Sequence, residues 1–230
     1  PPPPPPPFSS RRRHTRCNRW SRGLGDVYKR QGQTCVCANR VLVQEGIYEA
    51  FAERLAGKVA SLRVGPGTDE GSVQGPLINQ EAVEKVEAHI ADALGKGARL
   101  VTGGSRHRLG GTFFQPTVLA DVTPGMRVAR EETFGPVTPL FRFRTEEEAV
   151  AMANDTEYGL AAYFYTRDLG RAWRVSEALE YGMVGVNSGV ISTAVAPFGG
   201  VKQSGLGREG ARYGLDEDLE IKYVCVDIER

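Results

Sequence analysis

The stretch Gly32-Gln33-Thr34-Cys35-Val36-Cys37 places a cysteine among small and polar residues, directly before an apolar run. Backbone N–H groups at a turn or a helix start stabilise a thiolate and leave its sulfur accessible. Gly32 also permits backbone conformations that other residues resist. The stretch therefore predicts that Cys35 is a reactive thiolate, although a lone cysteine is more often a buried residue that packs as a small hydrophobe.

Three motifs further along the chain give this prediction a context. They are EETFGP at residues 131–136, Asn187, and PFGGVKQSGLGRE at residues 197–209. In this order after the first stretch, they resemble the aldehyde dehydrogenase superfamily, and the wording GQTCVC is most similar to its succinate-semialdehyde dehydrogenase branch. The resemblance runs over residues 32–223, nearly all of the chain that reads as a folded domain.

The resemblance implies the C-terminal catalytic portion of a longer enzyme. The family's cofactor-binding half lies before the nucleophile, and only 34 residues precede Cys35. By resemblance, that half supplies the dinucleotide-binding fold, an asparagine amide of the oxyanion hole, and the glutamate that activates water. We therefore expect this fragment to form an adduct at Cys35 but to complete no turnover.

Composition is ordinary for a soluble globular protein, at 230 residues with 40% hydrophobic and 25% charged residues. No apolar run approaches the length of a membrane span. The net charge is +1, but residues 32–230 hold 21 Lys and Arg against 27 Asp and Glu, a balance of −6. Four irregularly spaced cysteines and no secretory signal predict a reducing, cytoplasmic location. Neither a membrane nor a nucleic acid is an expected partner.

Residues 1–31 differ from the rest of the chain. They open on seven prolines and carry eight Lys and Arg against one acid, Asp26. No hydrophobic period is visible, so the segment is expected to be disordered. A nucleic-acid arm and an organelle-targeting peptide are two interpretations of its arginine run. A third, which we favour, is a foreign or mistranslated junction that is not native to the fold.

After this segment, hydrophobic periodicity alternates between strand and helix patterns. Thr145 and Glu148 match a capping box at a helix start. Strands that alternate with helices predict an α/β domain with a largely parallel sheet flanked by helices. The expected strands are residues 40–44, 99–102, 114–118, 138–143, 160–166 and 183–187, and the expected helices are 48–62, 80–95, 145–154 and 168–181.

The C-terminal run Ile221–Val226 is rich in β-forming residues, and such a strand must pair with another. By resemblance, it is an arm that crosses to a neighbouring subunit's sheet in a dimer or tetramer. An edge strand in the same domain is the alternative. We accordingly expect a disordered segment at 1–31, a catalytic domain at 32–215 and an oligomerisation arm at 216–230.

The chemistry expected of Cys35 follows from what aldehyde oxidation requires. A thiolate adds to the carbonyl carbon, makes it tetrahedral, and leaves a thioester for water to cleave once hydride has departed. The backbone amide of Cys35 itself is placed to hold the developing oxyanion. Cys35 is therefore the predicted nucleophile.

Cys37 follows two residues later, and in an extended segment the two sulfurs would point to the same side. A reversible Cys35–Cys37 disulfide, known for part of the branch, would switch the enzyme off. The alternative is that Cys37 simply packs. A metal site is not expected, because His14, His89 and His107 show no ligand spacing with each other.

By resemblance, Glu132 and Phe134 hold NAD or NADP: the carboxylate binds the nicotinamide ribose, and the ring flanks the cofactor. A carboxylate is suited to accept hydrogen bonds from a vicinal diol. The sequence GLGRE at residues 205–209 is not expected to bind phosphate, because no strand precedes it and the glycine spacing is incomplete.

Two residues are candidates for binding a small aldehyde substrate. Phe198 matches an aromatic wall of the family's substrate tunnel, with a core phenylalanine as the alternative. Ser192 stands where the semialdehyde branch places a serine that binds the substrate carboxylate, and an unpaired buried carboxylate is costly. The branch's arginine six residues before the nucleophile is replaced by Lys29.

The sequence thus predicts a catalytic fragment of an NAD(P)-dependent dehydrogenase that converts succinate semialdehyde to succinate. Glutarate semialdehyde is an alternative substrate. A non-catalytic truncated subunit that pairs with full-length dehydrogenase is an alternative function.

Overall fold

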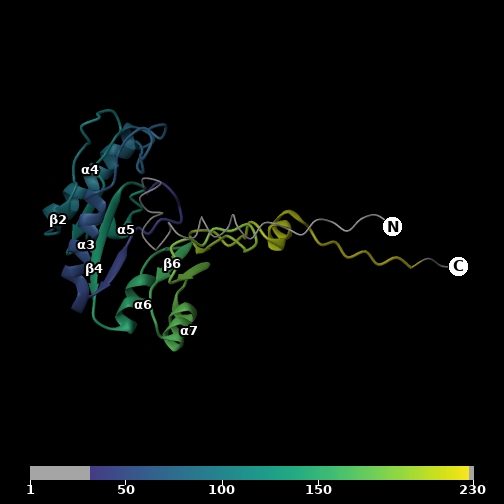
Figure 1. Cartoon of the computed structure of the whole chain (residues 1–230). Helices are drawn as coiled ribbons and strands as arrows, with labels where there is room; N and C mark the ends of the chain where they lie inside the picture. Colours follow the sequence, from purple (N-terminus) through teal and green to yellow (C-terminus); the bar gives the residue numbers. More distant parts are fainter. Residues whose placement is uncertain (1–31, 228–230) are drawn as a thin grey trace, which may run out of the picture.

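The computed structural model describes residues 32–227. The expectations for residues 1–31, including that of disorder, lie outside the described part of the chain. The described residues form a body of helices and strands from which a long arm projects (Figure 1). In this part of the chain, no helix is long and apolar enough to cross a bilayer.

The centre of the body is a sheet of four strands: β1 (Val41–Gln44), β2 (Arg99–Thr102), β3 (Thr117–Ala120) and β4 (Val137–Phe143). Their order is β1-β4-β3-β2. β1 and β3 both run parallel to β4, while β2 runs antiparallel to β3. The prediction of a largely parallel sheet in an α/β domain is confirmed.

Helices cover both faces of this sheet: α3 (Tyr48–Ala60) on one, and α4 (Gln80–Gly95) with the short α5 (Arg127–Arg130) on the other. Successive strand residues point to opposite faces. Val118 and Leu140 accordingly pack with α3, whereas Leu119 and Phe141 pack with α4. All four side chains are buried, so the alternation of the strands divides the core into two layers.

The remaining elements form a smaller second part. They are α6 (Glu146–Asn154), β5 (Tyr158–Gly159), β6 (Ala161–Phe164), α7 (Leu169–Ala178), β7 (Met183–Val186), β8 (Val201–Lys202) and the 3-10 helix η3 (Arg212–Asp218) on the arm. A further 3-10 helix, η2 (Glu45–Ile47), lies in the first part, between β1 and α3. β6 and β7 pair in parallel, and β5 and β8 pair antiparallel. The parallel pair lies where the body meets the arm (Figure 1).

Arg40 connects the first part to the second. Its guanidinium donates to the carbonyl oxygens of Met152 and Ala153 at 2.8 and 2.7 Å. These carbonyls belong to the last turn of α6, where helix carbonyls lack intrahelical partners and carry partial negative charge. The residue that enters β1 therefore also holds the end of α6.

Most expected elements lie close to their predicted bounds, and the differences have local causes. Thr145 accepts from the Glu148 N–H at 3.2 Å, as a capping box requires, but the Glu148 carboxylate accepts from Arg144 rather than from Thr145. The strand expected at 114–118 begins only at Thr117. Pro116 directly before it has no N–H to donate to a ladder.

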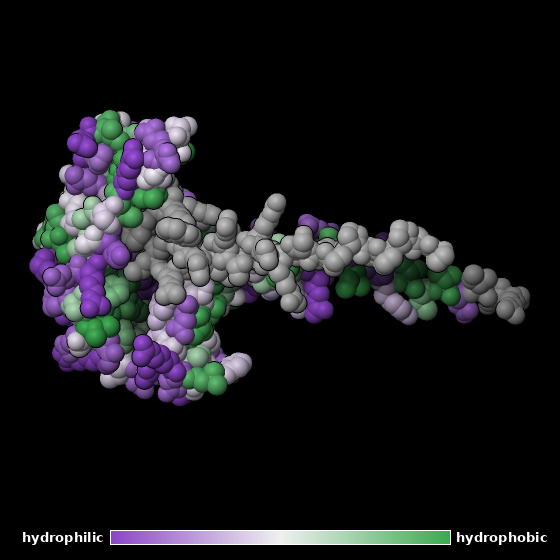
Figure 2. All heavy atoms as spheres, in the orientation of Figure 1, coloured by the Kyte–Doolittle hydropathy of each residue, from purple (hydrophilic) through white to green (hydrophobic). Residues whose placement is uncertain are grey.

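The expected terminal strand, Ile221–Val226, pairs with no strand in the described part of the chain. Its side chains are exposed, with Ile221 at 99% and Val224 at 67% of their full surface. The segment continues the arm away from the body, and apolar residues appear along it (Figures 1 and 2). An edge strand in the same domain is therefore the wrong alternative, and pairing with a neighbouring subunit stays a prediction.

Candidate functional site

The predicted nucleophile lies in a tight turn. The Cys37 N–H donates to the Thr34 carbonyl oxygen at 2.9 Å, and Cys35 between them is exposed. The expectation that Cys35 and Cys37 share an extended segment is wrong, because this hydrogen bond bends the chain. The turn leaves the Cys35 sulfur accessible to a reactant from outside.

A close backbone contact seats this turn on the loop of residues 131–136. Gly32 has φ +70°, in the left-handed region that favours glycine. A Cβ at this position would lie 2.1 Å from the Gly135 carbonyl oxygen, which no side chain tolerates. Because Gly32 is near Cys35 in sequence, and Gly135 is near Glu132 and Phe134, the contact brings the predicted nucleophile and cofactor residues onto adjoining loops.

Two side chains without an expected role also hold the turn. The Gln33 Oε1 accepts from the Ile78 N–H at 2.9 Å. The Tyr163 hydroxyl, on β6, donates to the Val36 carbonyl oxygen at 2.8 Å. The sequence carries one weak signal of this kind, since a tyrosine in a half-buried strand needs a partner for its hydroxyl.

Glu132 and Phe134 are both presented outward. Glu132 is exposed, and Phe134 keeps 37% of its surface exposed. Phe134 has φ +54°, a conformation that costs free energy in a bulky residue and is concentrated at functional sites. Thr133 between them is buried, so the loop is anchored at its centre while its two candidate side chains face solvent.

The anchor is His89, a fully buried residue of α4. Its Nδ1 lies 3.0 Å from the Thr133 Oγ1, and its Nε2 lies 3.1 Å from the Glu131 Oε2. Arg127 also donates to both Glu131 oxygens, at 2.8 and 2.9 Å. The sequence places His89 on a helix but gives no sign of these contacts, which join residues far apart in the chain.

The same contacts shift two pKa values. Burial lowers the pKa of His89 below its usual 6.5, outweighing the neighbouring Glu131 carboxylate, which acts in the opposite direction. Hydrogen bonds from Arg127, and then from His89, lower the pKa of Glu131 to about 2. At neutral pH, a neutral imidazole and an ionised carboxylate therefore support the loop.

The other predicted residues lie on later segments. Asn187 accepts from the Thr166 N–H at 2.9 Å and donates to the Thr166 carbonyl oxygen at 2.8 Å, so its side chain joins the residue after β7 to the segment after β6. Phe198 is half-buried, and its backbone exchanges two hydrogen bonds with Glu209 at 2.8 and 2.7 Å. These bonds tie Phe198 to Glu209 rather than to the Cys35 turn. Ser192 is exposed.

The residue before Ser192 lies near a side chain that holds the turn. The Ile191 Cγ2 and the Tyr163 Cδ1 both fill the space beside Gly185, at 2.9 and 2.8 Å from where a Cβ would stand. Tyr163 thus lies between the segment of Ser192 and the carbonyl of Val36. Among residues 32–227, no group of three or more His, Cys, Asp or Glu side chains is arranged to hold a metal ion.

Comparison with known proteins fits this arrangement of motifs. The aldehyde dehydrogenase family model matches residues 21–224, most of the chain. The chain belongs to the aldehyde dehydrogenase family. The resemblance drawn from the four motifs is confirmed.

Two curated relatives and one solved structure show how near the similarity is. The chain is 65% identical to the 3-sulfolactaldehyde dehydrogenase of Pseudomonas putida over 199 residues, and 60% identical to the NADP-dependent succinate-semialdehyde dehydrogenase of Escherichia coli K12 over 205 residues. These matches cover 86% and 89% of this chain. The crystal structure of a succinate-semialdehyde dehydrogenase from Burkholderia pseudomallei matches with a TM-score of 0.85 at 64% identity, over 89% of this chain.

The chain spans 41% and 42% of the length of these two curated relatives, and 43% of the chain in the crystal structure.

The His89 contacts predict how stability depends on pH. The unfolded chain binds a proton at His89 as the pH falls through about 6.5, whereas the folded chain resists it, so unfolding is favoured. Urea unfolding free energies should therefore decline between pH 7 and 5, by at most about 1.4 kcal/mol per pH unit from this group. His89→Gln should show a shallower decline over this range.

A second decline, to which Glu131 contributes together with other carboxylates of lowered pKa, should begin as the pH falls below 4.5 and continue toward about 2, and His89→Gln should keep most of it. Equal slopes for the native chain and His89→Gln between pH 7 and 5 would contradict the lowered pKa of His89.

Proposed function

We propose that the chain carries the catalytic cysteine and part of the cofactor site of an NAD(P)-dependent dehydrogenase that oxidises succinate semialdehyde to succinate. The contact between Gly32 and Gly135 is the observation that carries this proposal. It sets an exposed cysteine beside a loop that presents a carboxylate and an aromatic ring. Membership of the aldehyde dehydrogenase family supports the same reaction class.

The chemistry assigned to Cys35 is nucleophilic. Its thiolate forms a bond from sulfur to the carbonyl carbon of the aldehyde, and the carbonyl oxygen takes the negative charge. The backbone N–H of Cys35 is the proposed hydrogen-bond donor to that oxygen. After oxidation, the resulting thioester is cleaved by water, which yields the carboxylic acid and returns the thiol.

Glu132 and Phe134 fit the nicotinamide end of a dinucleotide. An exposed carboxylate accepts hydrogen bonds from ribose hydroxyls, and an outward aromatic ring at φ +54° is held ready to flank a planar group. When bound, the nicotinamide accepts the hydride that leaves the substrate carbon. Glu132 and Phe134 hold and orient that group next to Cys35, while Cys35 keeps the substrate in place.

The proposed substrate class is a short aldehyde with an anionic group at its other end. The similar proteins are named for 3-sulfolactaldehyde and for succinate semialdehyde, which share this chemistry. The exposed Ser192 hydroxyl, which Ile191 and Tyr163 connect to the Cys35 turn, is the proposed donor to the anionic group. Phe198 is proposed as an apolar wall. Glutarate semialdehyde, which has the same two groups and is one methylene longer than succinate semialdehyde, is the alternative substrate.

Assembly and location belong to the same proposal. The arm exposes apolar side chains at Ile221, Tyr223, Val224 and Val226. Exposed apolar strands of this kind favour pairing with another subunit, so a homodimer or homotetramer is proposed. The proposed cellular location is the cytoplasm. The proposed domain bounds are 32–215 for the catalytic part and 216–230 for the arm.

A chimera that joins residues 32–230 to the N-terminal portion of the Escherichia coli relative tests the function. It should reduce NADP or NAD with succinate semialdehyde, and Cys35→Ser should lower kcat at least about a thousandfold, because a hydroxyl is a far weaker nucleophile than a thiolate. Glu132→Gln should mainly raise KM for the nucleotide. Nucleotide reduction is followed by absorbance, with glutarate semialdehyde and 3-sulfolactaldehyde as competing substrates.

Cys225→Ser is the matched control, since this exposed cysteine lies on the arm. It should leave kcat unchanged. Turnover that survives Cys35→Ser would show that the nucleophile is another residue, and a chimera that folds without any turnover would favour the non-catalytic subunit.

We propose a redox switch at Cys37 as well, because Cys37 follows Cys35 by two residues in the same turn. Mild oxidation of the chain should make Cys35 unreactive to iodoacetamide, dithiothreitol should reverse this, and Cys37→Ser should prevent the reversible loss. Peptide mass spectrometry reads out the Cys35–Cys37 bond. Equal reversible loss in Cys37→Ser would contradict the switch.

A further inference from the structure

The Cys35 turn is held from two sides by side chains that belong to neither the nucleophile nor the cofactor loop. On one side, the Tyr163 hydroxyl donates to the Val36 carbonyl oxygen at 2.8 Å. On the other, Gln33 reaches the segment before α4, where its Oε1 accepts from the Ile78 N–H at 2.9 Å and its Nε2 lies 3.5 Å from the Pro76 carbonyl oxygen. Gln33, two residues before Cys35, and Val36, directly after it, are therefore both tied to distant parts of the body.

Tyr163 is itself fixed by its surroundings. It sits in β6, which pairs with β7 so that Tyr163 lies opposite Gly185. The missing side chain at Gly185 leaves the space into which the Tyr163 ring and Ile191 both fit. A ring that is wedged in this way holds its hydroxyl at one position, so the hydrogen bond to Val36 transmits the rigidity of β6 and β7 to the turn.

We propose that Gln33 and Tyr163 are positioning residues that hold the Cys35 sulfur in its reactive orientation. The inference rests on the proposed role of Cys35 as nucleophile. The Tyr163 hydroxyl holds the carbonyl of Val36, directly after Cys35. The Gln33 side chain anchors the chain two residues before Cys35 by its hydrogen bond with the Ile78 N–H. Together they fix both ends of the turn that the Thr34–Cys37 hydrogen bond closes.

Fixing the turn matters for a nucleophile because reaction requires sulfur, carbonyl and oxyanion donor to be aligned together. A misplacement of about 1 Å is enough to lose a large part of the rate. The contact of Gly32 with Gly135 fixes where the turn begins, and it does not itself involve the residues after Cys35. Tyr163 supplies that second restraint, from a different part of the fold.

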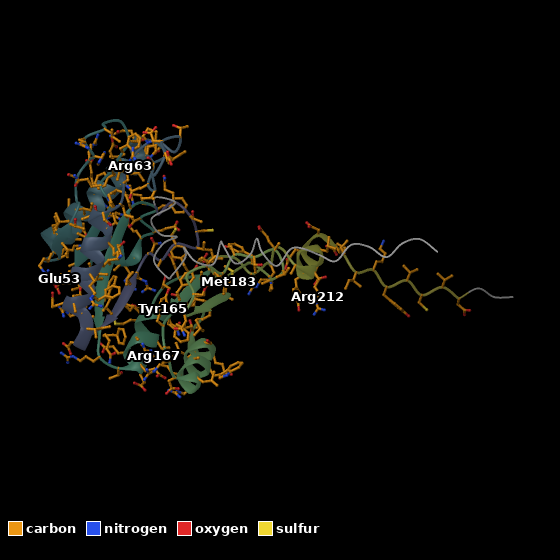
Figure 3. The ribbon with its side chains drawn as sticks, in the orientation of Figure 1. Glu53, Arg63, Tyr165, Arg167, Met183 and Arg212 are labelled. Carbon is orange, nitrogen blue, oxygen red and sulfur yellow. The ribbon has the colours of Figure 1, made fainter. Side chains whose placement is uncertain are left out.

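The test uses the 230-residue chain and variants that remove single polar contacts. Tyr163→Phe keeps the ring beside Gly185 and deletes the hydroxyl, and Gln33→Met keeps the length of the side chain and deletes both polar atoms. Tyr165→Phe is the matched control: it lies just beyond the end of β6, its side chain is 58% exposed, and Figure 3 labels it. Thermal unfolding confirms that each variant is folded.

Two readouts are compared. Amide hydrogen exchange of residues 34–38 should be about fivefold faster in Tyr163→Phe and in Gln33→Met, as expected for the loss of one hydrogen bond, and unchanged in Tyr165→Phe. The rate of Cys35 alkylation by iodoacetamide is then measured at one fixed pH, with Cys225 in the same molecule as the reference. In both clamp variants the ratio of the Cys35 rate to the Cys225 rate should fall, because the sulfur is no longer held in its reactive orientation.

Each outcome of these measurements either supports or overturns the proposal. Unchanged exchange at residues 34–38 in folded Tyr163→Phe and Gln33→Met would overturn the clamp. Faster exchange with an unchanged ratio of the Cys35 rate to the Cys225 rate would overturn the claim that the clamp orients the sulfur. If Tyr163→Phe fails to fold, Gln33→Met alone decides, because Gln33 is only partly buried and its hydrogen bonds are exposed. Failure of the proposed function is seen separately, as absence of turnover in the chimera with these exchange results intact.

Discussion

A backbone contact between two glycines determines whether this chain has a site at all. Gly32 approaches the Gly135 carbonyl so closely that a Cβ would lie 2.1 Å from its oxygen. Gly135 has no room either, since a Cβ there would lie 2.5 Å from the Val86 Cγ2 on α4. The turn of Cys35 therefore rests on the loop of Glu132 and Phe134, and that loop rests on α4. The order of support runs from the helix to the cofactor loop to the nucleophile.

The buried chemistry of α4 explains why this support is firm. Both ring nitrogens of His89 have hydrogen-bond partners, one in Thr133 and one in Glu131. Arg127 adds a further hydrogen bond to the Glu131 carboxylate. A buried polar group that is fully hydrogen-bonded is costly to displace, because its partners would be left unpaired. The loop can therefore hold Phe134 in a strained conformation while its flanks remain exposed to a ligand.

Local patterns in the sequence predicted much of the fold. The helix at 80–95 and the strand at 99–102 have the bounds that hydrophobic periodicity predicts, because apolar spacing suffices to specify them. Motif resemblance led to Cys35, Glu132 and Phe134 as candidates. The strand expected at 114–118 is shifted by Pro116, and the terminal run lies exposed because the described chain offers it no partner strand.

The hydrogen bonds that hold the site together could not be predicted from local sequence patterns. Gln33 with Ile78, Tyr163 with Val36, and His89 with Thr133 each join segments that are remote in sequence, and no local period or spacing encodes such a pairing. The turn at Cys35 was misjudged as extended for a related reason. Its shape follows from the glycine contact and the Thr34–Cys37 bond, which depend on where the neighbouring loop lies.

The most direct measurement is amide hydrogen exchange, resolved by peptide mass spectrometry, in Gly32→Ala. Gly57→Ala is the control, because a Cβ at this helical position meets open space. The account predicts that Gly32→Ala speeds exchange both in residues 33–38 and in residues 131–136, whereas Gly57→Ala changes neither. Faster exchange confined to residues 33–38, with the loop of Glu132 and Phe134 unaffected, would show that the nucleophile turn does not rest on the cofactor loop and would contradict the account.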